Sequence, residues 1–372
     1  MKAPSFPASV DPSPSHGIQV TLMIDPKALK LAATCSHDRQ FTVCRFSPDG
    51  AFLLAAGHDG RLSRWRIEDQ KKESFDAHRG WVEAMVSHAA SQRLFTADSW
   101  GQVHCWRTTP EALAAEMKPE WSIEGACGSW LRSLAVSPDG KWIATCGNEP
   151  VVRIYSTDDG KLSHELRGHE QPVFSVAFTP DGTELASGDL YGMVRHWKLD
   201  SGAFVRQLEA RQLFKTFHHY QQGGIRAMTF DPAGATLYCG GFQGTNANQA
   251  QGTPTVVAFD WKSGAPQTVM TPADPFTGPV MDLVFHPDGF LIGSGSSEGG
   301  GALWFWKPGE EKSFHLVKYQ NSFRRMDLSS DGTRLAAAAF GDLGGQRGGN
   351  GRQLNKSGEY VDFGGSVVVY QA

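Results

Sequence analysis

The sequence predicts an all-β fold in which seven small antiparallel sheets form a closed ring. Three observations lead to this prediction. A short turn element, written most fully as Thr179-Pro180-Asp181-Gly182, recurs along the chain. Each copy joins two apolar-rich segments, and a third segment that ends in an aromatic residue follows. Because one small sheet cannot bury both of its faces alone, neighbouring sheets must stack and close into a ring.

The best-preserved repeat covers residues 167–202. Gly168-His169 precedes a first apolar-rich strand, a second strand follows the turn, and a third strand carries Trp197. The turn residues suit a tight hairpin, since Pro presets φ, Asp bonds its own backbone and Gly accepts a positive φ. This segment therefore predicts a three-stranded meander.

The turn element recurs in phase through the rest of the chain. Its other copies lie at residues 47–50, 137–140, 231–234, 286–289 and 329–332, with a weaker form at residues 87–90. The tightest spacings are about 40 to 43 residues, the period of a propeller blade with four strands. The aromatic residues that end the third strands are Trp65, Trp106, Tyr155, Trp197, Phe259, Trp306 and Tyr370. Seven copies predict seven blades, with insertions where the spacing is longer.

With these motifs, roughly residues 28–372 resemble the WD40 β-propeller family. The resemblance implies a seven-bladed ring and a role as a scaffold. It also implies a buried network of His, Ser or Thr, Asp and Trp in each blade, which we expect here only in part. In blade four, His169, Ser187 and Trp197 match this pattern, whereas Tyr191 stands at the position expected for Asp.

Blade one also matches the network incompletely. His37, Asp59 and Trp65 are present, but Ala55 replaces the hydroxyl residue. We therefore expect apolar packing, more than polar networks, to hold most blades together.

The two ends of the chain are predicted to meet in one blade. Residues 366–370 form the third strand of blade seven, which leaves that blade one strand short. We expect residues 28–34 to supply its outer strand and close the ring, because an open ring would expose sheet edges. Residues 18–24 could add a further strand. The Pro- and Ser-rich residues 1–17 are predicted to be a disordered tail, and residues 18–372 a single propeller.

Composition narrows the possible partners and compartments. The formal net charge of −4 gives no reason to expect a nucleic-acid partner. The six cysteines are scattered without a C-x-x-C pair, which indicates small buried side chains in a reducing compartment. Residues 1–17 contain no continuous apolar stretch, so we expect neither a signal peptide nor a membrane span and favour a cytoplasmic location.

Insertions mark one face of the predicted ring. A segment at residues 110–120 is expected to form a helical turn or two on the opposite face. The other elaborations are an insertion at 209–223, a second at 243–252, and glycine-rich loops at 293–301 and 341–365. We expect these four to converge on the face that carries the Gly-His loops. Elaborated loops on a rigid scaffold are where binding groups tend to lie.

A second set of candidates surrounds the central opening. Counting back six residues from the turn proline position reaches the start of each inner strand, at Thr42, Val82, Arg132, Phe174, Arg226, Met281 and Arg324. Arg132, Arg226 and Arg324 would place positive charge around the mouth, suited to a carboxylate or phosphate held by paired hydrogen bonds. The alternative is that each arginine pairs with a nearby acid such as Asp282 or Glu83.

Aromatic residues add to the candidate surface. Trp81 and Trp130 begin inner strands, whereas the others lie in loops or in the 209–223 insertion: Trp100, Tyr191, Phe217 and Tyr220. Aromatic and arginine side chains dominate the energetics of protein interfaces. The alternative is that these rings pack locally within their blades.

The sequence offers little for catalysis. His218-His219 is the nearest approach to a metal ligand set, but adjacent histidines seldom face one ion, so we expect no metal and no cofactor. Residues 344–351 lack the G-x-x-x-x-G-K-[ST] pattern of a phosphate loop, and no catalytic motif stands out. We therefore predict a non-enzymatic scaffold that binds a protein or peptide with an acidic group around the central opening. The alternatives are a hydrolase or lactonase-like propeller enzyme that uses the channel, and a structural subunit of a larger complex; the oligomeric state stays open.

Overall fold

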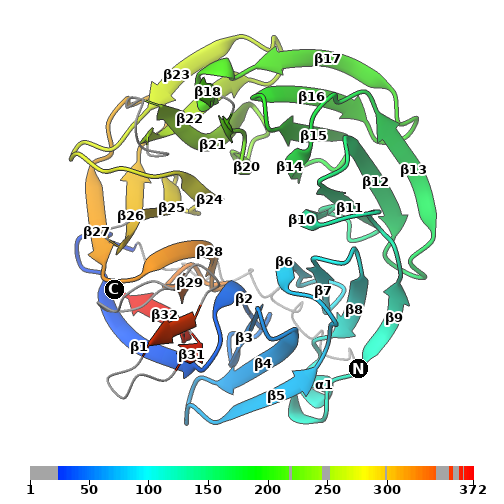
Figure 1. The fold of residues 1–372 in the computed structure, drawn as a ribbon, viewed down its shortest axis with the longest axis vertical. Helices are drawn as coiled ribbons and strands as arrows, with labels where there is room; N and C mark the ends of the chain where they lie inside the picture. Colours follow the sequence, from blue (N-terminus) through cyan, green and yellow to red (C-terminus); the bar gives the residue numbers. More distant parts are fainter. Residues whose placement is uncertain are drawn as a thin grey trace, which may run out of the picture.

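The computed structural model describes residues 24–217, 220–244, 252–297, 300–340, 352–354, 360–362 and 364–372. Over these residues the chain forms seven four-stranded antiparallel sheets arranged as blades around a central opening (Figure 1). The predicted seven-bladed β-propeller is therefore confirmed.

The first four blades follow one another along the chain, each running from the central opening to the rim. Blade one contains β2 (Phe41–Phe46), β3 (Phe52–Gly57), β4 (Arg61–Arg66) and β5 (Lys72–Asp76). Blade two contains β6 (Val82–His88), β7 (Arg93–Asp98), β8 (Val103–Arg107) and β9 (Pro119–Ile123). Blade three contains β10 (Leu131–Val136), β11 (Trp142–Gly147), β12 (Val151–Ser156) and β13 (Leu162–Arg167). Blade four contains β14 (Val173–Phe178), β15 (Glu184–Asp189), β16 (Met193–Lys198) and β17 (Phe204–Glu209).

The remaining blades carry the longer strands and the additional hairpins. Blade five contains β20 (Ala227–Phe230), β21 (Thr236–Gly244), β22 (Gly252–Asp260) and β23 (Pro266–Met270). Blade six contains β24 (Val280–Phe285), β25 (Leu291–Ser297), β26 (Gly300–Trp306) and β27 (His315–Tyr319). Blade seven contains β28 (Ser322–Leu328), β29 (Arg334–Phe340), β32 (Gly365–Gln371) and β1 (Lys30–His37). The additional elements are η1 (Arg211–Leu213), the hairpin of β18 (Phe214–Phe217) and β19 (Tyr220–Gly223), and the hairpin of β30 (Arg352–Leu354) and β31 (Tyr360–Asp362).

The N-terminal strand closes the ring. β1 pairs antiparallel with β32, with Cys35 opposite Val367, and so forms the outer edge of blade seven. The C-terminus lies beside β1 (Figure 1). The predicted closure is confirmed, although the strand begins and ends a few residues later than the predicted 28–34. The predicted strand at 18–24 and the tail at 1–17 lie outside the described residues, apart from the buried Ile24.

The hydrophobic core is divided into seven clusters, one between each pair of neighbouring blades. The cluster between blades seven and one contains Phe41, Trp65 and Val367, so the closing blade is packed like the others. Burying such side chains stabilises a fold by roughly 1.5–3 kcal/mol each. Each blade therefore depends on both neighbours for its apolar faces.

The His networks are more complete than the sequence suggested. In blade four the His169 ring lies 2.7 Å from the Ser187 hydroxyl and 2.9 Å from the Asp189 carboxylate, and Trp197 donates to Ser187 at 2.8 Å. Tyr191 does stand at the position of Asp59 in blade one, as the sequence indicated, but Asp189, two residues earlier, supplies the acid of this network. Asp189 ends β15, whereas Tyr191 lies in the following turn, where its amide donates to Asp189.

Blade two contains a second network that the sequence reading missed. The His78 ring lies 2.7 Å from the Thr96 hydroxyl and 3.5 Å from Asp98, and Trp106 donates to Thr96 at 2.8 Å. In blade one His37 lies 2.7 Å from Asp59 without a bridging hydroxyl, because Ala55 occupies the equivalent position. Apolar clusters, in contrast, join all seven blades.

The glycine-rich segment at 293–301 is mostly strand, not a loop. β25 and β26 pair from Leu291 opposite Trp306 to Ser297 opposite Gly300. Glycine is needed here because a Cβ at Gly293 would lie 2.7 Å from the Trp306 ring, and one at Gly295 would lie 2.4 Å from the Trp304 ring. The glycines leave room for two buried tryptophans. Most of the loop predicted at 341–365, like residues 245–251 of the second insertion, lies outside the described residues.

Three further features of the fold concern the segment at residues 110–120, the cysteines and the helices. Residues 110–120 contain, as expected, a helical turn, α1 (Pro110–Ala114). The Thr109 hydroxyl caps its N-terminus. All six cysteines are buried and unpaired, as predicted for small core side chains. None of the described helices has the length and apolar character to cross a bilayer.

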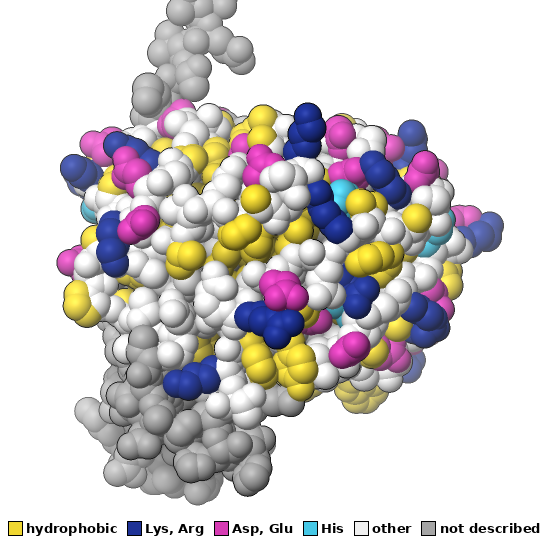
Figure 2. Space-filling model, turned by 90° about the horizontal axis from the view of Figure 1, so that it is seen from above, with side chains coloured by type: hydrophobic (Ala, Val, Ile, Leu, Met, Phe, Trp, Pro, Cys, Tyr) yellow, Lys and Arg dark blue, Asp and Glu magenta, His cyan; other side chains and the backbone are white. Residues whose placement is uncertain are grey.

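The rim seen in Figure 2 mixes acidic, basic and apolar side chains. The exposed apolar residues of the outer strands β17 and β23 are Phe204, Val205 and Val269.

Candidate interaction site at the central opening

A recurring backbone irregularity aims side chains into the central opening. Six of the seven inner strands contain a one-residue bulge near their first position, at which the pairing with the next strand shifts. A bulge breaks the alternation of side chains between faces and can redirect one of them. The residues at the bulges are Thr42, Glu83, Arg132, Phe174, Met281 and the pair Arg324 and Arg325.

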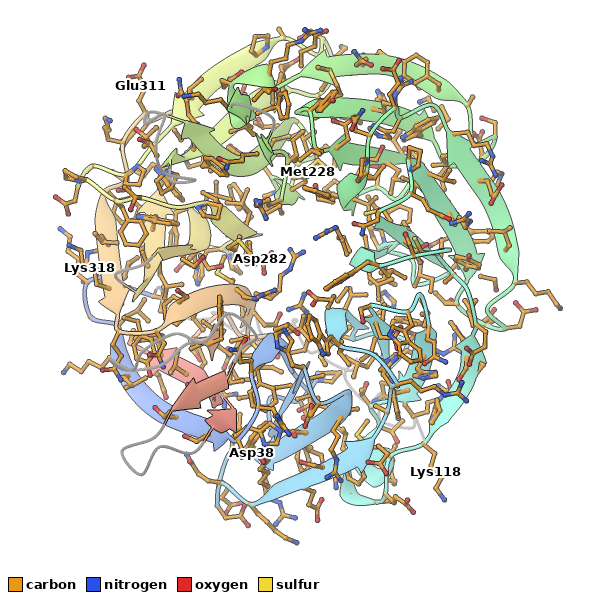
Figure 3. The ribbon with its side chains drawn as sticks, viewed as in Figure 1. Asp38, Lys118, Met228, Asp282, Glu311 and Lys318 are labelled. Carbon is orange, nitrogen blue, oxygen red and sulfur yellow. The ribbon has the colours of Figure 1, made fainter. Side chains whose placement is uncertain are left out.

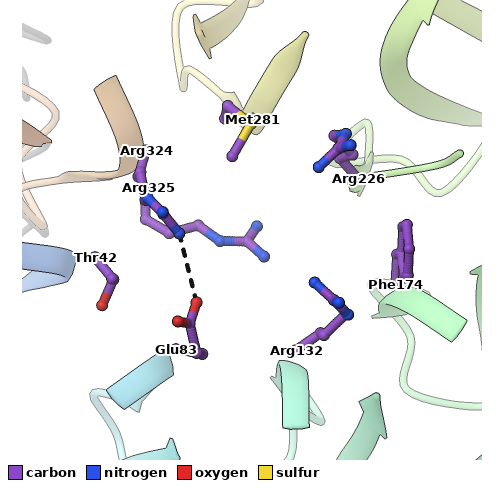
Figure 4. Close-up of a pocket in the computed structure, with 8 residues that line it drawn as sticks. All are labelled: Thr42, Glu83, Arg132, Phe174, Arg226, Met281, Arg324 and Arg325. Atoms are coloured by element: carbon purple, nitrogen blue, oxygen red, sulfur yellow. Dashed lines mark ion pairs between the residues drawn. The ribbon is translucent and has the colours of Figure 1, made fainter. Parts of the chain in front are cut away.

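In blade five, Arg226 also projects into the central opening, but from the start of a strand without a bulge. Arg226 stands just before β20, and its amide donates to the Gly240 carbonyl at 2.9 Å. Its side chain joins the bulge residues, and together these eight residues line a pocket of about 90 Å³ (Figure 4). The structure therefore brings Arg132, Arg226 and Arg324 together in one pocket, at the place that the sequence indicated.

In blade two, the residue that lines the central opening differs from the predicted one. Val82 is fully buried in the core, and Glu83 faces the opening instead. The error came from the weak turn at 87–90, because the turn of this blade runs from Ala89 to Gln92, with Gln92 N donating to Ala89 O at 3.1 Å. Gln92 takes the positive φ, 51°, that glycine supplies in other blades. Because Ser87 and Leu94 pair as Phe46 and Leu53 do in blade one, the turn proline position falls on Ala89, one residue later than predicted, and counting back six residues from Ala89 gives Glu83.

Aromatic rings hold the three arginines in place. Phe174 lies between two of them, with its ring centroid 4.7 Å from the Arg132 guanidinium and 6.0 Å from that of Arg226. The Arg324 guanidinium lies 4.7 Å from the Phe340 ring. A guanidinium that stacks on a ring keeps its N–H donors free.

The alternative that each arginine pairs with an acid holds for only one of the three. Arg324 forms an ion pair with Glu83 at 3.6 Å. Arg132 donates from Nε to the neutral Asn148 side chain at 2.7 Å. Among the described residues Arg226 has no acidic partner, and its buried Nε lacks a hydrogen bond. Figure 4 shows Arg226 across the pocket from Glu83.

The protonation equilibria reflect this excess of positive charge. Burial, together with the charges of Arg132 and Arg324, lowers the pKa of Arg226 to about 10. Burial also lowers the pKa of Arg132 and of Arg324, although Glu83 opposes the shift. Burial raises the pKa of the Glu83 carboxyl against the opposing effect of Arg324. An added anion would relieve the poor solvation of these guanidinium groups.

The pocket opens into a wider funnel of about 650 Å³. Two of the segments that the sequence marked as elaborated contribute Gln222 and Ser296 to its wall, and Phe242 and Phe340 stand just before the other two. On the other side of the funnel the wall contains Trp81 and Trp130, whose rings meet edge to face at 5.5 Å. Trp81 is 44% exposed and stacks on His58 at 4.4 Å. The funnel therefore has an aromatic wall and a floor of arginines.

Of the other predicted aromatic residues, two lie outside the funnel, and two have side chains outside the described residues. Trp100 is 65% exposed in the loop between β7 and β8, and Tyr191 packs on Phe214 at 4.5 Å. Neither belongs to the described lining of the funnel. The backbone at Phe217 and Tyr220 forms the β18–β19 hairpin, but their side chains lie outside the described residues, as does the pair His218 and His219.

Deeper in the channel, positive and negative charges balance. A cavity of about 250 Å³ adjoins the arginine pocket and is lined in part by Arg45, Asp282, Arg325 and Asp327. Arg325 pairs with Asp282 at 3.2 Å, and burial raises the pKa of Asp327 to about 6. Figure 3 shows Asp282 and Met228 at the central opening. The excess charge is therefore confined to the mouth, on Arg132, Arg226 and Arg324.

The described lining offers few groups for catalysis. Glu83 is the one carboxylate in the described wall of the pocket and of the funnel. Within the part of the chain that the structure describes, no three His, Cys, Asp or Glu side chains lie together as metal ligands. The chemistry that this lining supports is the binding of an anion beside aromatic surface.

Several lining residues were not anticipated from the sequence. Arg325 shares the bulge of β28 with Arg324, and Asn148, His58 and Phe340 contact the lining residues from neighbouring strands and loops. Their positions depend on which blades become neighbours. The sequence signal that could have indicated Arg325 was its place beside Arg324 at the start of a strand.

Comparison with known proteins agrees with the fold. A model of the WD domain, G-beta repeat, matches residues 29–66, 117–156 and 160–198. Echinoderm microtubule-associated protein-like 2 of Homo sapiens is 25% identical over 207 residues, which cover 48% of this chain and 32% of that protein. Pre-mRNA-processing factor 19 of Oryza sativa subsp. japonica is 26% identical over 324 residues, covering 83% of this chain and 56% of that protein.

A third relative is WD repeat-containing protein 1-B of Xenopus laevis, 30% identical over 156 residues, which cover 41% of this chain and 24% of that protein. The chain thus aligns with about half or less of the length of these relatives. Each matched segment runs from the outer strand of one blade through the first three strands of the next blade, and the third relative is named for its WD repeats. The chain is a seven-bladed β-propeller in which three segments match the WD domain, G-beta repeat.

Proposed function

We propose that this propeller is a non-enzymatic interaction scaffold that binds a protein or peptide in the funnel on its loop-rich face. The observation that carries the proposal is the convergence of Arg132, Arg226 and Arg324 on one pocket with a single acidic partner, Glu83. An acidic group of the partner would occupy the pocket, and apolar groups beside it would contact Trp81 and Trp130. WD40 propellers are typically interaction proteins, which supports the same role.

Electrostatics and packing have separate tasks in this proposal. Clustered positive charge steers an acidic segment toward the opening and fixes its register. The half-exposed Trp81 offers apolar area that loses water when a partner covers it, and such aromatic anchors supply much of the binding energy at interfaces. The rigid ring keeps both features in place before binding.

The test is recovery of partners from a cell extract with tagged full chain. Arg226→Ala and Trp81→Ala should each reduce recovery of the same proteins, by about tenfold or more, without lowering the melting temperature by more than a few degrees. Matched controls are Arg66→Ala, an exposed arginine paired only with the exposed Asp69, and Phe204→Ala, an exposed aromatic on the rim. These controls should leave recovery unchanged.

Two results would overturn the proposal. Equal recovery with Arg226→Ala and the unsubstituted chain would show that partners do not use the arginine pocket. A loss of recovery with Phe204→Ala but not with Trp81→Ala would place the partner on the rim, as expected for a structural subunit held by its outer strands.

A further inference from the structure

We infer that the arginine pocket takes a doubly charged phosphate monoester, carried by a phosphorylated side chain of an extended partner segment. This inference rests on the proposed function, since it names the acidic group that the funnel accepts. It depends on four features: the free donors, the net charge, the shape of the donor set and the ion pair between Glu83 and Arg324.

The first feature is the number of unused donors. A guanidinium has five N–H donors and no acceptor. The structure shows one side-chain hydrogen bond for Arg132, to Asn148, and none for Arg226 within the described residues. Because Phe174 holds both groups by its ring faces, their position does not depend on a hydrogen-bond partner. The donors are therefore positioned in advance for a ligand.

The second feature is the net charge. Three guanidinium groups face one carboxylate at the mouth, and the fourth arginine, Arg325, is neutralised by Asp282. The mouth therefore carries a net charge of about two positive units, by the full ionisation expected of Arg and Glu near pH 7. A phosphate monoester has a charge of roughly −1.5 to −2 at this pH, whereas a carboxylate has −1. The dianion matches the site.

The third feature is the direction of the donors. Arg132, Arg226 and Arg324 project from blades three, five and seven, so they approach the opening from three sides (Figure 4). A phosphate monoester has three terminal oxygens arranged around one axis, and each can accept from a different arginine. A carboxylate has two oxygens in one plane, so its acceptors match three converging guanidinium groups less well.

The fourth feature is an internal competitor. Glu83 lies 3.6 Å from Arg324, so its carboxylate already neutralises one arm of the site. Its side chain is 13% exposed, and burial raises its pKa, which indicates a poorly solvated acid. A phosphate bound by Arg324 would displace this contact. Glu83 therefore weakens binding, and its removal should strengthen it.

The funnel favours a polypeptide over a free ion. The arginine pocket measures about 90 Å³, but it opens into about 650 Å³ lined by Trp81, Trp130 and Phe242. Inorganic phosphate would fill only the floor. A phosphorylated side chain would place its own backbone against the aromatic wall, so binding energy would come from both parts.

The experiment measures capture of three peptide libraries by the full chain at moderate salt. The libraries share random flanking residues and differ at one fixed position, which is phosphoserine, glutamate or serine. We expect phosphoserine peptides to bind about tenfold or more tightly than glutamate peptides, and inorganic phosphate to compete only at far higher concentration. Arg226→Ala should abolish the preference for phosphoserine, whereas Glu83→Gln should raise phosphoserine affinity about three- to tenfold. Arg66→Ala is the control and should change neither value.

Arg226→Ala should lower the affinity for phosphoserine peptides, and Glu83→Gln should raise it. A misfolded variant can only lose affinity, so these opposite effects would distinguish a role in binding from a role in folding. If glutamate peptides bind as well as phosphoserine peptides and Arg226→Ala weakens both, the phosphate inference fails and the interaction scaffold remains. If Glu83→Gln lowers phosphoserine affinity, the inferred competition is wrong. If no library binds and Arg226→Ala also leaves partner recovery unchanged, both the inference and the proposed function fail.

Discussion

The imidazole of His169 lies 2.9 Å from the carboxylate of Asp189, and both are buried in blade four. His169→Ala would leave Asp189 and Ser187 without their buried partner, so we expect the free energy of unfolding to fall by about 2–4 kcal/mol. His164→Ala, at a half-buried ring bonded only to Ser163, should cost less than about 0.5 kcal/mol. Chemical denaturation of both variants checks this, and equal costs would contradict a structural network.

Ring closure provides a second prediction. Without residues 1–35 the chain lacks most of β1, so β32 becomes an open edge and the apolar face behind Val367 loses its cover. Such a chain should aggregate or melt well below the full chain. Removal of residues 1–17 alone should leave melting unchanged. A truncated chain without residues 1–35 that melts like the full chain would refute the closure.

The glycines of β25 provide a third prediction. A Cβ at Gly295 would lie 2.4 Å from the Trp304 ring and 2.5 Å from the Pro279 carbonyl, so Gly295→Ala should cost about 2–3 kcal/mol through overpacking. Gly309→Ala is the control, because nothing lies within 4 Å of its Cβ position, but its φ is +81°. Backbone strain alone should cost about 1–2 kcal/mol there. Urea denaturation of both variants measures the two losses of stability. An unchanged midpoint for Gly295→Ala would contradict tight packing at this position.

A fourth prediction concerns acid stability. Burial, reinforced by His78, lowers the pKa of His104 to about 4, compared with 6.5 in the unfolded chain. Below pH 6.5 the unfolded state binds a proton that the folded state refuses, so stability is lost as the pH falls from 6.5 toward 4. This one group should remove about 2 kcal/mol of the free energy of unfolding between pH 7 and pH 5.

His104→Asn tests this contribution, because Asn can keep the hydrogen bond to Ser122 without titrating. The stability of the variant should fall less steeply between pH 7 and pH 5, by about the same 2 kcal/mol. Parallel slopes for the two proteins would show that His104 does not titrate abnormally.

Phe174 provides a fifth prediction, on binding. Phe174→Leu keeps an apolar side chain but removes the ring face that orients Arg132 and Arg226, so partner affinity should fall about three- to tenfold while net charge is unchanged. Phe204→Leu is a matched control, because Arg195 lies 5.1 Å from that ring on the rim. Partner titrations of both variants check this, and an equal effect at Phe204 would contradict a role for the arginine pocket.

The sequence placed the three arginines correctly because each stands at the same position of a repeat, where the inner strand begins. It misplaced Glu83 because blade two lacks the Pro-Asp-Gly signal and its turn falls on Ala89 to Gln92. It also missed the acid of the blade four network, because Asp189 supplies it from two residues before the position expected for Asp, where Tyr191 stands. In blade two the difference is one residue, and a shift of one residue changes the face to which a strand side chain points. In blade four the acid ends β15 instead of lying in the turn that follows it.

The sequence alone determined the number of blades, the closure by the N-terminal strand and the burial of the cysteines. These features depend on local turn chemistry and on a repeat period that the chain itself displays. Only the tertiary structure decided that Phe174 lies between two arginines, that Glu83 reaches Arg324 and that Arg226 has no acidic partner among the described residues. These contacts join blades that are distant in sequence, and the closed ring with its bulged inner strands brings them together.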